Sequence, residues 1–195
     1  MNITIYHIML ILLHLLMVNY VHNTGSSFYN NRIAQQKITP KVYDIGIKYT
    51  PNLSDNTVLI YLSHFLAIVL PLMFGESVLK TYIQYWIVIY IIRYLFNSIT
   101  ILPKDKTCDD NNFSFTNYIT GHCYDKIFSG HFASGVLLSL ILYNKGIVTS
   151  IPLLVILNSL NAFLILSLRF HYSIDLLVAI LVTVIVYQNN LKLKL

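Results

Sequence analysis

VTSIPLLVILNSLNAFLILSLRFHYSIDLLVAILVTVIVY, at residues 148–187, decides the fold class of this chain. It contains two long apolar runs, 148–168 and 170–187, with only a short polar break between them. An α-helix needs about 20 apolar residues to cross the roughly 30 Å of hydrocarbon in a bilayer, and both runs come close to that length. Four more such runs lie at 3–21, 57–74, 82–102 and 127–143. The sequence therefore predicts an all-α, polytopic membrane protein with six transmembrane helices.

The composition of the 195-residue chain agrees with this prediction, because 56% of its residues are hydrophobic and only 11% are charged. A typical water-soluble domain has about 25% charged residues. The thirteen Lys and Arg residues are scattered over the loops, so the net charge of +5 indicates attraction to anionic headgroups rather than nucleic-acid binding. The polar segments at 22–56 and 103–126 are too short to form cores of their own. We therefore expect one membrane domain over residues 1–195, with an irregular loop at 22–56.

The first apolar run and the placement of the loops follow from the same pattern. The run at 3–21 has no basic segment before it and is longer than the apolar part of a signal peptide, so we expect a retained span, with cleavage as the alternative. Counting the six spans puts the two long loops, 22–56 and 103–126, on the same side as the break at Arg169. The fourth and sixth spans therefore begin at one membrane surface.

Two glycosylation sequons and two cysteines indicate which compartment the long loops face. Asn52 and Asn112 each begin a glycosylation sequon in a long loop, which favours a lumenal or external face and a membrane of the secretory pathway or the cell surface. Cys108 and Cys123 lie in one of these loops and can pair if it faces an oxidising compartment. Two cysteines alone leave both the pairing and the compartment open.

Two short histidine motifs indicate phosphoryl chemistry. FSGHF, at 128–132, opens the fourth span, and HYSID, at 171–175, opens the sixth. His171 and Asp175 are four residues apart on one helix face, so the carboxylate can hold the imidazole in one tautomer and leave its other nitrogen free to attack phosphorus. His131 is then available to protonate the departing alkoxide. These three residues are the predicted catalytic set.

Basic residues near the two motifs are candidates for offsetting the phosphate charge. Arg93, Lys126 and Arg169 are the candidate phosphate contacts. Arg93 can equally well pair with Asp125 or Asp175, because a buried charge inside a span needs a partner. Lys126 and Arg169 lie at span boundaries, where such side chains often only extend toward the interface.

Other groups complete the predicted substrate site. Backbone N–H groups at Ser129 and Gly130, at a helix N-terminus, can receive phosphate oxygens. The ring of Tyr172 can contact a choline ammonium. The full set of candidate substrate-binding residues is Arg93, Asp125, Lys126, Ser129, Gly130, Arg169 and Tyr172.

The remaining histidines and cysteines do not follow a metal-binding pattern. CxxC, HxxxH and HExxH spacings do not occur, so neither a metal nor another cofactor is expected. His7, His14 and His64 are isolated in apolar runs and are expected to have no part in the chemistry.

At these motifs the chain resembles the sphingomyelin synthase family, a branch of the phosphatidic acid phosphatase type 2 (PAP2) superfamily. CYDKIFSGH, at 123–131, is similar to the family's Cys-Gly-Asp to Ser-Gly-His pattern, and HYSID is similar to its His-Tyr-Thr/Ser-Ile/Val-Asp pattern. RYLFNSITILP, at 93–103, and PKVYDIGIKYTP, at 40–51, resemble two further segments of the family. Tyr124 stands where the family has a glycine, and Phe170 where it usually has an acidic residue.

The resemblance implies a six-transmembrane bundle of the PAP2 type that acts on membrane lipids. It implies transfer of phosphocholine, or a related headgroup, from a glycerophospholipid such as phosphatidylcholine to ceramide, with release of diacylglycerol. His171 would form the phosphohistidine, His131 would act as acid and then as base, and Asp175 would orient His171. The alternatives are a lipid phosphatase or phospholipase C-like hydrolase, and a non-catalytic membrane lipid-binding protein.

Overall fold

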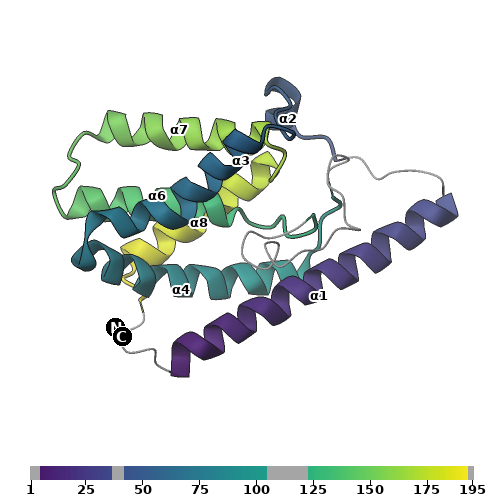
Figure 1. Cartoon of the computed structure of the whole chain (residues 1–195), viewed down its shortest axis with the longest axis horizontal. Helices are drawn as coiled ribbons and strands as arrows, with labels where there is room; N and C mark the ends of the chain where they lie inside the picture. Colours follow the sequence, from purple (N-terminus) through teal and green to yellow (C-terminus); the bar gives the residue numbers. More distant parts are fainter. Residues whose placement is uncertain (1–4, 37–41, 105–122, 193–195) are drawn as a thin grey trace. The chain divides into compact units, whose positions relative to one another are not determined.

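The computed structural model describes residues 5–36, 42–104 and 123–192, and within them it has seven α-helices and no strand. The helices, shown in Figure 1, are α1 (Ile5–Gln36), α2 (Ile45–Tyr49), α3 (Thr57–His64), α4 (Glu76–Ile99), α6 (Gly130–Asn144), α7 (Ile151–Ser167) and α8 (Ser173–Gln188). A π-helical segment, η1 (Phe65–Val69), and a 3-10 segment, η2 (Leu70–Phe74), follow α3. The all-α class expected from the sequence is confirmed.

The helices follow the apolar runs in order, but the run at 57–74 is not one regular helix. It divides into α3, η1 and η2, and Pro71 lies at the start of η2. Proline has no N–H to donate to the carbonyl four residues earlier, so a regular α-helix is interrupted there. Across the described part of the chain, no helix combines the length and the hydropathy that crossing a membrane requires.

The prediction of an irregular loop over residues 22–56 is wrong for residues 22–36, because α1 continues to Gln36. The first proline of the sequence is Pro40, so no residue before it prevents the helix from continuing. Gly25 lies within this stretch, and a Cβ atom there would come within 2.5 Å of the Tyr124 side chain. The small residue that reads as a loop signal in the sequence is therefore used for close packing.

Unit 1 is the first of two compact units into which the chain divides, and it comprises Met1–Tyr43 and Tyr94–Ile127. Its described part contains a small core in which the ring of Tyr29 stacks on Tyr124, with 5.9 Å between the ring centroids. The core residues and the side chains packed on them are Val21, Tyr29, Ile101, Cys123 and Tyr124. Cys123 is disulfide-bonded, and Cys108, the partner considered in the sequence, lies outside the described residues.

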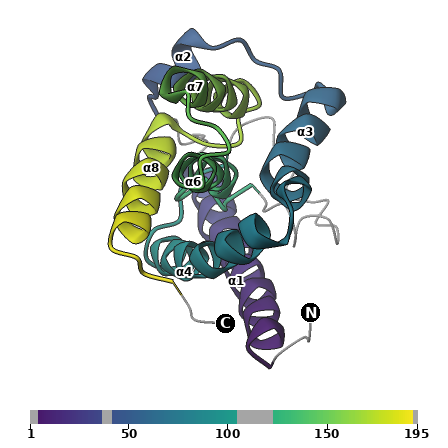
Figure 2. The same cartoon turned by 90° about the vertical axis from the view of Figure 1, so that its left-hand side faces the viewer.

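Unit 2 comprises Asp44–Arg93 and Phe128–Leu195, and α6 is its central helix. α6 packs against α7, α8 and η1, and Figure 2 shows these elements around it. Its buried residues are Gly130, Phe132, Ala133, Ser134, Leu137, Leu138, Ile141 and Leu142. They cover most of the helix circumference, as expected for a helix enclosed by others.

The helices of unit 2 begin at defined residues because polar side chains cap them. Ser129 Oγ accepts a hydrogen bond of 3.2 Å from the backbone N–H of Phe132 at the start of α6. Asn56 and Ser150 cap α3 and α7 in the same way. Such a cap satisfies an N–H group that has no partner within the helix. The cap at Ser129 therefore places His131 in the first turn of α6.

Candidate active site

His171, in the turn before α8, lies beside Asp175, in the first turn of that helix, so the two do not share a helix face as the sequence predicted. Nδ1 of His171 is 3.7 Å from Oδ2 of Asp175, and both side chains are buried. The same Oδ2 accepts a hydrogen bond of 2.8 Å from the backbone N–H of Tyr172, which holds the carboxylate in place. Because the carboxylate faces Nδ1, Nε2 is the nitrogen of His171 on the side of the ring away from Asp175.

A second carboxylate, which the sequence analysis does not identify, holds the same turn from outside. Asp44 accepts hydrogen bonds from the backbone N–H and the hydroxyl of Ser173, each 2.8 Å long. The hydroxyl oxygen of Ser173 in turn accepts a hydrogen bond of 3.0 Å from the backbone N–H of Gly46. These contacts join the N-termini of α2 and α8. Ser173 lies between His171 and Asp175 in the sequence, so the contacts restrain the turn that carries both.

The start of α6 is attached to the same turn. The backbone N–H of Ser129 donates to the backbone carbonyl of Asp175 over 3.3 Å. This hydrogen bond brings the SGH motif next to the HYSID motif. A Cβ atom at Gly130 would lie 2.5 Å from Oη of Tyr90 and 3.4 Å from Nε of Arg93, so only glycine fits there without displacing a neighbour.

His131 belongs to a cluster of three histidine rings at this place. Its ring centroid is 6.5 Å from that of His171 and 5.1 Å from that of His64. Phe170 contacts two of the rings, with centroid distances of 5.7 Å to His131 and 5.8 Å to His64. His64 is the last residue of α3, directly before the π-helical segment η1. The sequence predicted no part in the chemistry for His64, and it gave no indication that this ring lies against His131.

Arg93 is buried and lies against the N-terminus of α6. Its Nε donates a hydrogen bond of 2.7 Å to the carbonyl oxygen of Phe128, and its guanidinium carbon is 5.5 Å from the ring centroid of Tyr90. Arg93 therefore puts a positive charge beside the turn that begins with Ser129. A contact with phosphate stays a prediction for this residue.

Arg169 has contacts with the protein that the sequence analysis did not foresee. Its guanidinium donates to Oγ1 and to the carbonyl oxygen of Thr50, over 2.9 and 3.0 Å. It also donates to the carbonyl oxygen of Leu166 over 2.9 Å. Thr50 follows α2, so Arg169 connects the segment after α2 to the end of α7. A phosphate contact by Arg169 stays a prediction, as does a headgroup contact by the buried Tyr172.

Asp125 and Lys126 belong to unit 1, whereas the three histidines belong to unit 2. Both residues are buried, and Asp125 Oδ1 accepts a hydrogen bond of 2.6 Å from the side-chain amide of Asn97. Asn97 is thus a hydrogen-bond partner of Asp125 within unit 1. Roles in substrate binding stay predictions for both residues.

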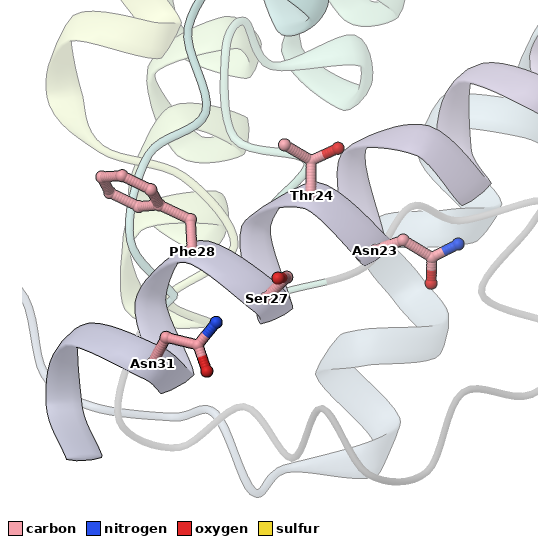
Figure 3. A pocket seen from close by; sticks show the side chains of 5 residues that line it. All are labelled: Asn23, Thr24, Ser27, Phe28 and Asn31. Atoms are coloured by element: carbon pink, nitrogen blue, oxygen red, sulfur yellow. The ribbon is translucent and has the colours of Figure 1, made fainter. Parts of the chain in front are cut away.

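The cavity described in unit 1 does not include any of these residues. In the described ranges, no group of three or more His, Cys, Asp or Glu side chains is arranged to hold a metal ion. Figure 3 shows a shallow depression on α1 in unit 1, lined by Asn23, Thr24, Ser27, Phe28 and Asn31. All five side chains come from one helix, and they include no acidic, basic or histidine side chain that could do chemistry.

Comparison with known families finds a match in the half of the chain that carries the histidine motifs. Residues 122–191 match the PAP2 superfamily C-terminal domain, which is found in sphingomyelin synthase-like proteins. The match includes His131, His171 and Asp175. Comparison with curated proteins and with solved structures finds no match. The domain indicates a protein related to lipid phosphatases and phosphotransferases.

Proposed function

We propose that this chain is a lipid phosphotransferase that moves phosphocholine, or a related phospho-headgroup, from a glycerophospholipid to ceramide. The observation that carries the proposal is the pairing of His171 with Asp175 at 3.7 Å, beside the His131 ring at 6.5 Å, inside the matched PAP2 domain. A nucleophile oriented by a carboxylate, with a second proton-transfer group nearby, is the arrangement that covalent phosphoryl transfer needs.

In the first half of the reaction, Nε2 of His171 attacks the phosphorus of the donor. The bond between phosphorus and the diacylglycerol oxygen breaks, its electron pair goes to that oxygen, and His131 gives the oxygen a proton. In the second half, His131 takes the proton of the ceramide hydroxyl, whose oxygen attacks phosphorus while the bond from phosphorus to His171 breaks. Asp175 faces Nδ1 and stabilises the positive charge that develops on His171.

The phosphate oxygens would lie at the start of α6. The first N–H groups of a helix have no acceptor within it and carry part of the positive end of the helix dipole. Gly130 is the first residue of α6, and Arg93 lies against it. In this proposal the Gly130 N–H and the Arg93 guanidinium together receive the charge of the phosphoryl group.

The proposed setting is a membrane of the secretory pathway or the cell surface, with residues 1–195 as one polytopic domain whose active site faces the lumen or the exterior. Apolar side chains that are more than half exposed support lipid contact: Val155, Ile156 and Leu160 on α7, and Leu177, Leu181 and Ile185 on α8. Large exposed apolar side chains that gather on a protein surface often mark contact with a membrane or a partner. The disulfide at Cys123 supports an oxidising compartment. Extraction of cell membranes with alkaline carbonate tests the setting, and release of the protein into the soluble fraction would refute it.

The activity is tested with the full chain purified in mixed micelles that contain phosphatidylcholine and fluorescent ceramide. We expect a fluorescent product carrying phosphocholine, formed by the wild-type chain and not by His171→Gln. A His7→Gln variant is the matched control, since no part of the reaction is assigned to that residue. Folded protein that forms no such product from any of the common headgroup donors would overturn the transferase proposal.

The same assay detects the hydrolytic alternative, which the PAP2 match also supports. If water resolves the phosphohistidine, diacylglycerol and free phosphocholine appear at the same rate with or without ceramide. An effect on cellular lipids that survives His171→Gln would instead favour the non-catalytic, lipid-binding alternative.

A further inference from the structure

The third ring of the histidine cluster, His64, has no role in the reaction as derived so far. It comes from α3, whereas His131 comes from α6 and His171 from the turn before α8. Within the ring contacts described for unit 2, His131 contacts both other histidines, and His64 contacts His131 and Phe170. His64 therefore lies next to the proton-transfer residue, and His131 lies between it and the nucleophile.

The backbone around His64 changes from α-helix to π-helix, which affects the direction of this ring. α3 ends at His64, and the next five residues form the π-helical segment η1. A π-helical turn inside a helix is uncommon and often occurs at functional sites, because the extra residue changes the direction of the side chains around it. η1 packs against α6, so the change of direction occurs where α3 meets the helix that carries His131.

Both imidazoles have ring nitrogens that can take part in chemistry. Among the described residues, no hydrogen bond involves the side chain of His64 or of His131, and both side chains are half-buried. Two imidazole rings this close do not carry two positive charges at low cost, because like charges in a poorly solvated site repel each other. The two rings therefore carry at most one added proton between them at a time.

We propose that His64 is a positioning residue that shares with His131 the one proton passed to the departing alkoxide and later taken back from the acceptor hydroxyl. The inference rests on the proposed function. The pair begins with one proton, loses it when the bond from phosphorus to the alkoxide oxygen breaks, and regains it when the acceptor oxygen bonds to phosphorus. His64 holds the proton within the site and keeps His131 able to act first as acid and then as base.

Two substrates with different leaving groups distinguish a role of His64 in proton transfer from a role in packing alone. A diacylglycerol alkoxide must be protonated as it leaves, whereas p-nitrophenolate leaves without a proton. His64→Phe keeps a ring against His131 and Phe170 but removes both nitrogens. In a single turnover, we expect it to slow diacylglycerol release from phosphatidylcholine about a hundredfold, within the range for loss of general acid catalysis. In the first turnover of p-nitrophenylphosphocholine, we expect it to slow p-nitrophenolate release by less than about threefold.

Phe170→Leu is the matched control, because it disturbs the packing of the same two rings and removes no ionisable group. It should change both rates by the same factor. If His64→Phe also changes both rates equally, or changes neither, the inference is overturned while the proposed function stands. If the wild-type chain releases neither product, the proposed function is overturned, and the inference with it.

Chemical rescue gives a second measurement that does not depend on the aryl substrate. His64→Ala removes the ring, and added imidazole can supply the missing proton carrier to the site. We expect imidazole to restore diacylglycerol release, whereas pyrrole, which has the same shape and no basic nitrogen, should not. Equal effects of imidazole and pyrrole would show that only the volume of the ring matters and would overturn the inference.

Discussion

Asp44 and Ser173 are 129 residues apart in the sequence, and two hydrogen bonds of 2.8 Å join them at the start of α8. One comes from the backbone N–H of Ser173 and the other from its hydroxyl. Asp44 also caps α2 by accepting from the backbone N–H of Ile47 over 2.9 Å. A single carboxylate thus sets the start of two helices, one of which carries Asp175.

Asp44→Ala should therefore destabilise the turn that carries His171 and Asp175, although it changes none of the proposed catalytic residues. Loss of a helix cap costs about 0.5–2 kcal/mol of stability, so we expect a lower melting temperature together with slower formation of the phosphohistidine. Asp44→Asn keeps one side-chain oxygen, so its melting temperature and its rate of phosphohistidine formation should lie between those of Asp44→Ala and the wild type. Thermal unfolding and single-turnover labelling measure the two effects.

The control for this prediction is Asp55→Ala. Asp55 is exposed and, among the described residues, its side chain accepts only a long hydrogen bond of 3.4 Å, from its neighbour Ser54. It should match the wild type in both measurements. If Asp44→Ala also matches the wild type, the two hydrogen bonds to Ser173 do not support the turn.

Asp175→Asn should separate orientation of His171 from folding of α8. Asparagine keeps an oxygen for the N–H of Tyr172 but removes the negative charge that faces Nδ1 of His171. Loss of the corresponding aspartate in a serine protease lowers kcat by about 10⁴ and leaves the geometry intact, and we expect a loss of at least about 10² here. The rate of diacylglycerol release checks this, and circular dichroism checks the helix content. Activity within about threefold of the wild type would contradict the role of Asp175.

The pairing of His171 with Asp175 could be predicted from the sequence because it is local. The physical reason differs from the expected one, because α8 begins at Ser173 and His171 lies in the turn before it rather than on the helix. Asp175, in the first turn of α8, directs its carboxylate back to the N–H of Tyr172 and so reaches His171. The proximity of His131 to His171 was predicted by less direct reasoning, since a count of predicted spans indicates only that two helices begin on one side. The hydrogen bond between Ser129 and Asp175 gives the actual connection.

His64 and Asp44 could not be found in this way, because their contacts depend on how distant helices pack. A lone histidine in an apolar run has no local signal, and His64 reaches the cluster through the π-helical segment after it. Asp44 did have a weak signal, since an Asp directly before a short helix is a typical N-cap. The predicted loop at 22–56 failed for a related reason, because Gly25 packs against Tyr124 instead of ending the helix.

Gly130→Ala should disturb the phosphate end of the proposed site. Its Cβ would lie 2.5 Å from Oη and 3.1 Å from Cζ of Tyr90. Tyr90 cannot easily withdraw, because its ring stacks on Trp86 with 3.8 Å between the centroids. Overpacking of this kind costs about 1–3 kcal/mol, so we expect both the melting temperature and the activity to fall.

A second substitution tests whether the clash with Tyr90 is the cause. Tyr90→Phe removes Oη, the closest atom, and should restore part of both losses when combined with Gly130→Ala. Tyr90→Phe alone serves as the control. Losses that simply add in the double variant would show that the clash lies elsewhere.

Arg169 is a candidate for a structural contact and for a phosphate contact, and the structure shows the structural one. Two nitrogens of its guanidinium donate to Thr50, at Oγ1 and at the carbonyl oxygen. A lysine cannot reproduce this two-point contact, although it keeps the positive charge. If Arg169 acts by holding Thr50, then Arg169→Lys and Arg169→Gln should lower the melting temperature by similar amounts and leave the KM for the phospholipid donor near the wild-type value.

Thr50→Val completes a double-mutant cycle with Arg169→Gln, because it removes Oγ1 and keeps the shape of the side chain. Residues in contact couple by about 0.5–3 kcal/mol, so the double variant should lose less stability than the sum of the single ones. The charge itself would be what matters if Arg169→Gln raises the donor KM about tenfold while Arg169→Lys does not. In that case Arg169 must leave Thr50 when the substrate binds, and the contact seen here is the one that the phosphate replaces.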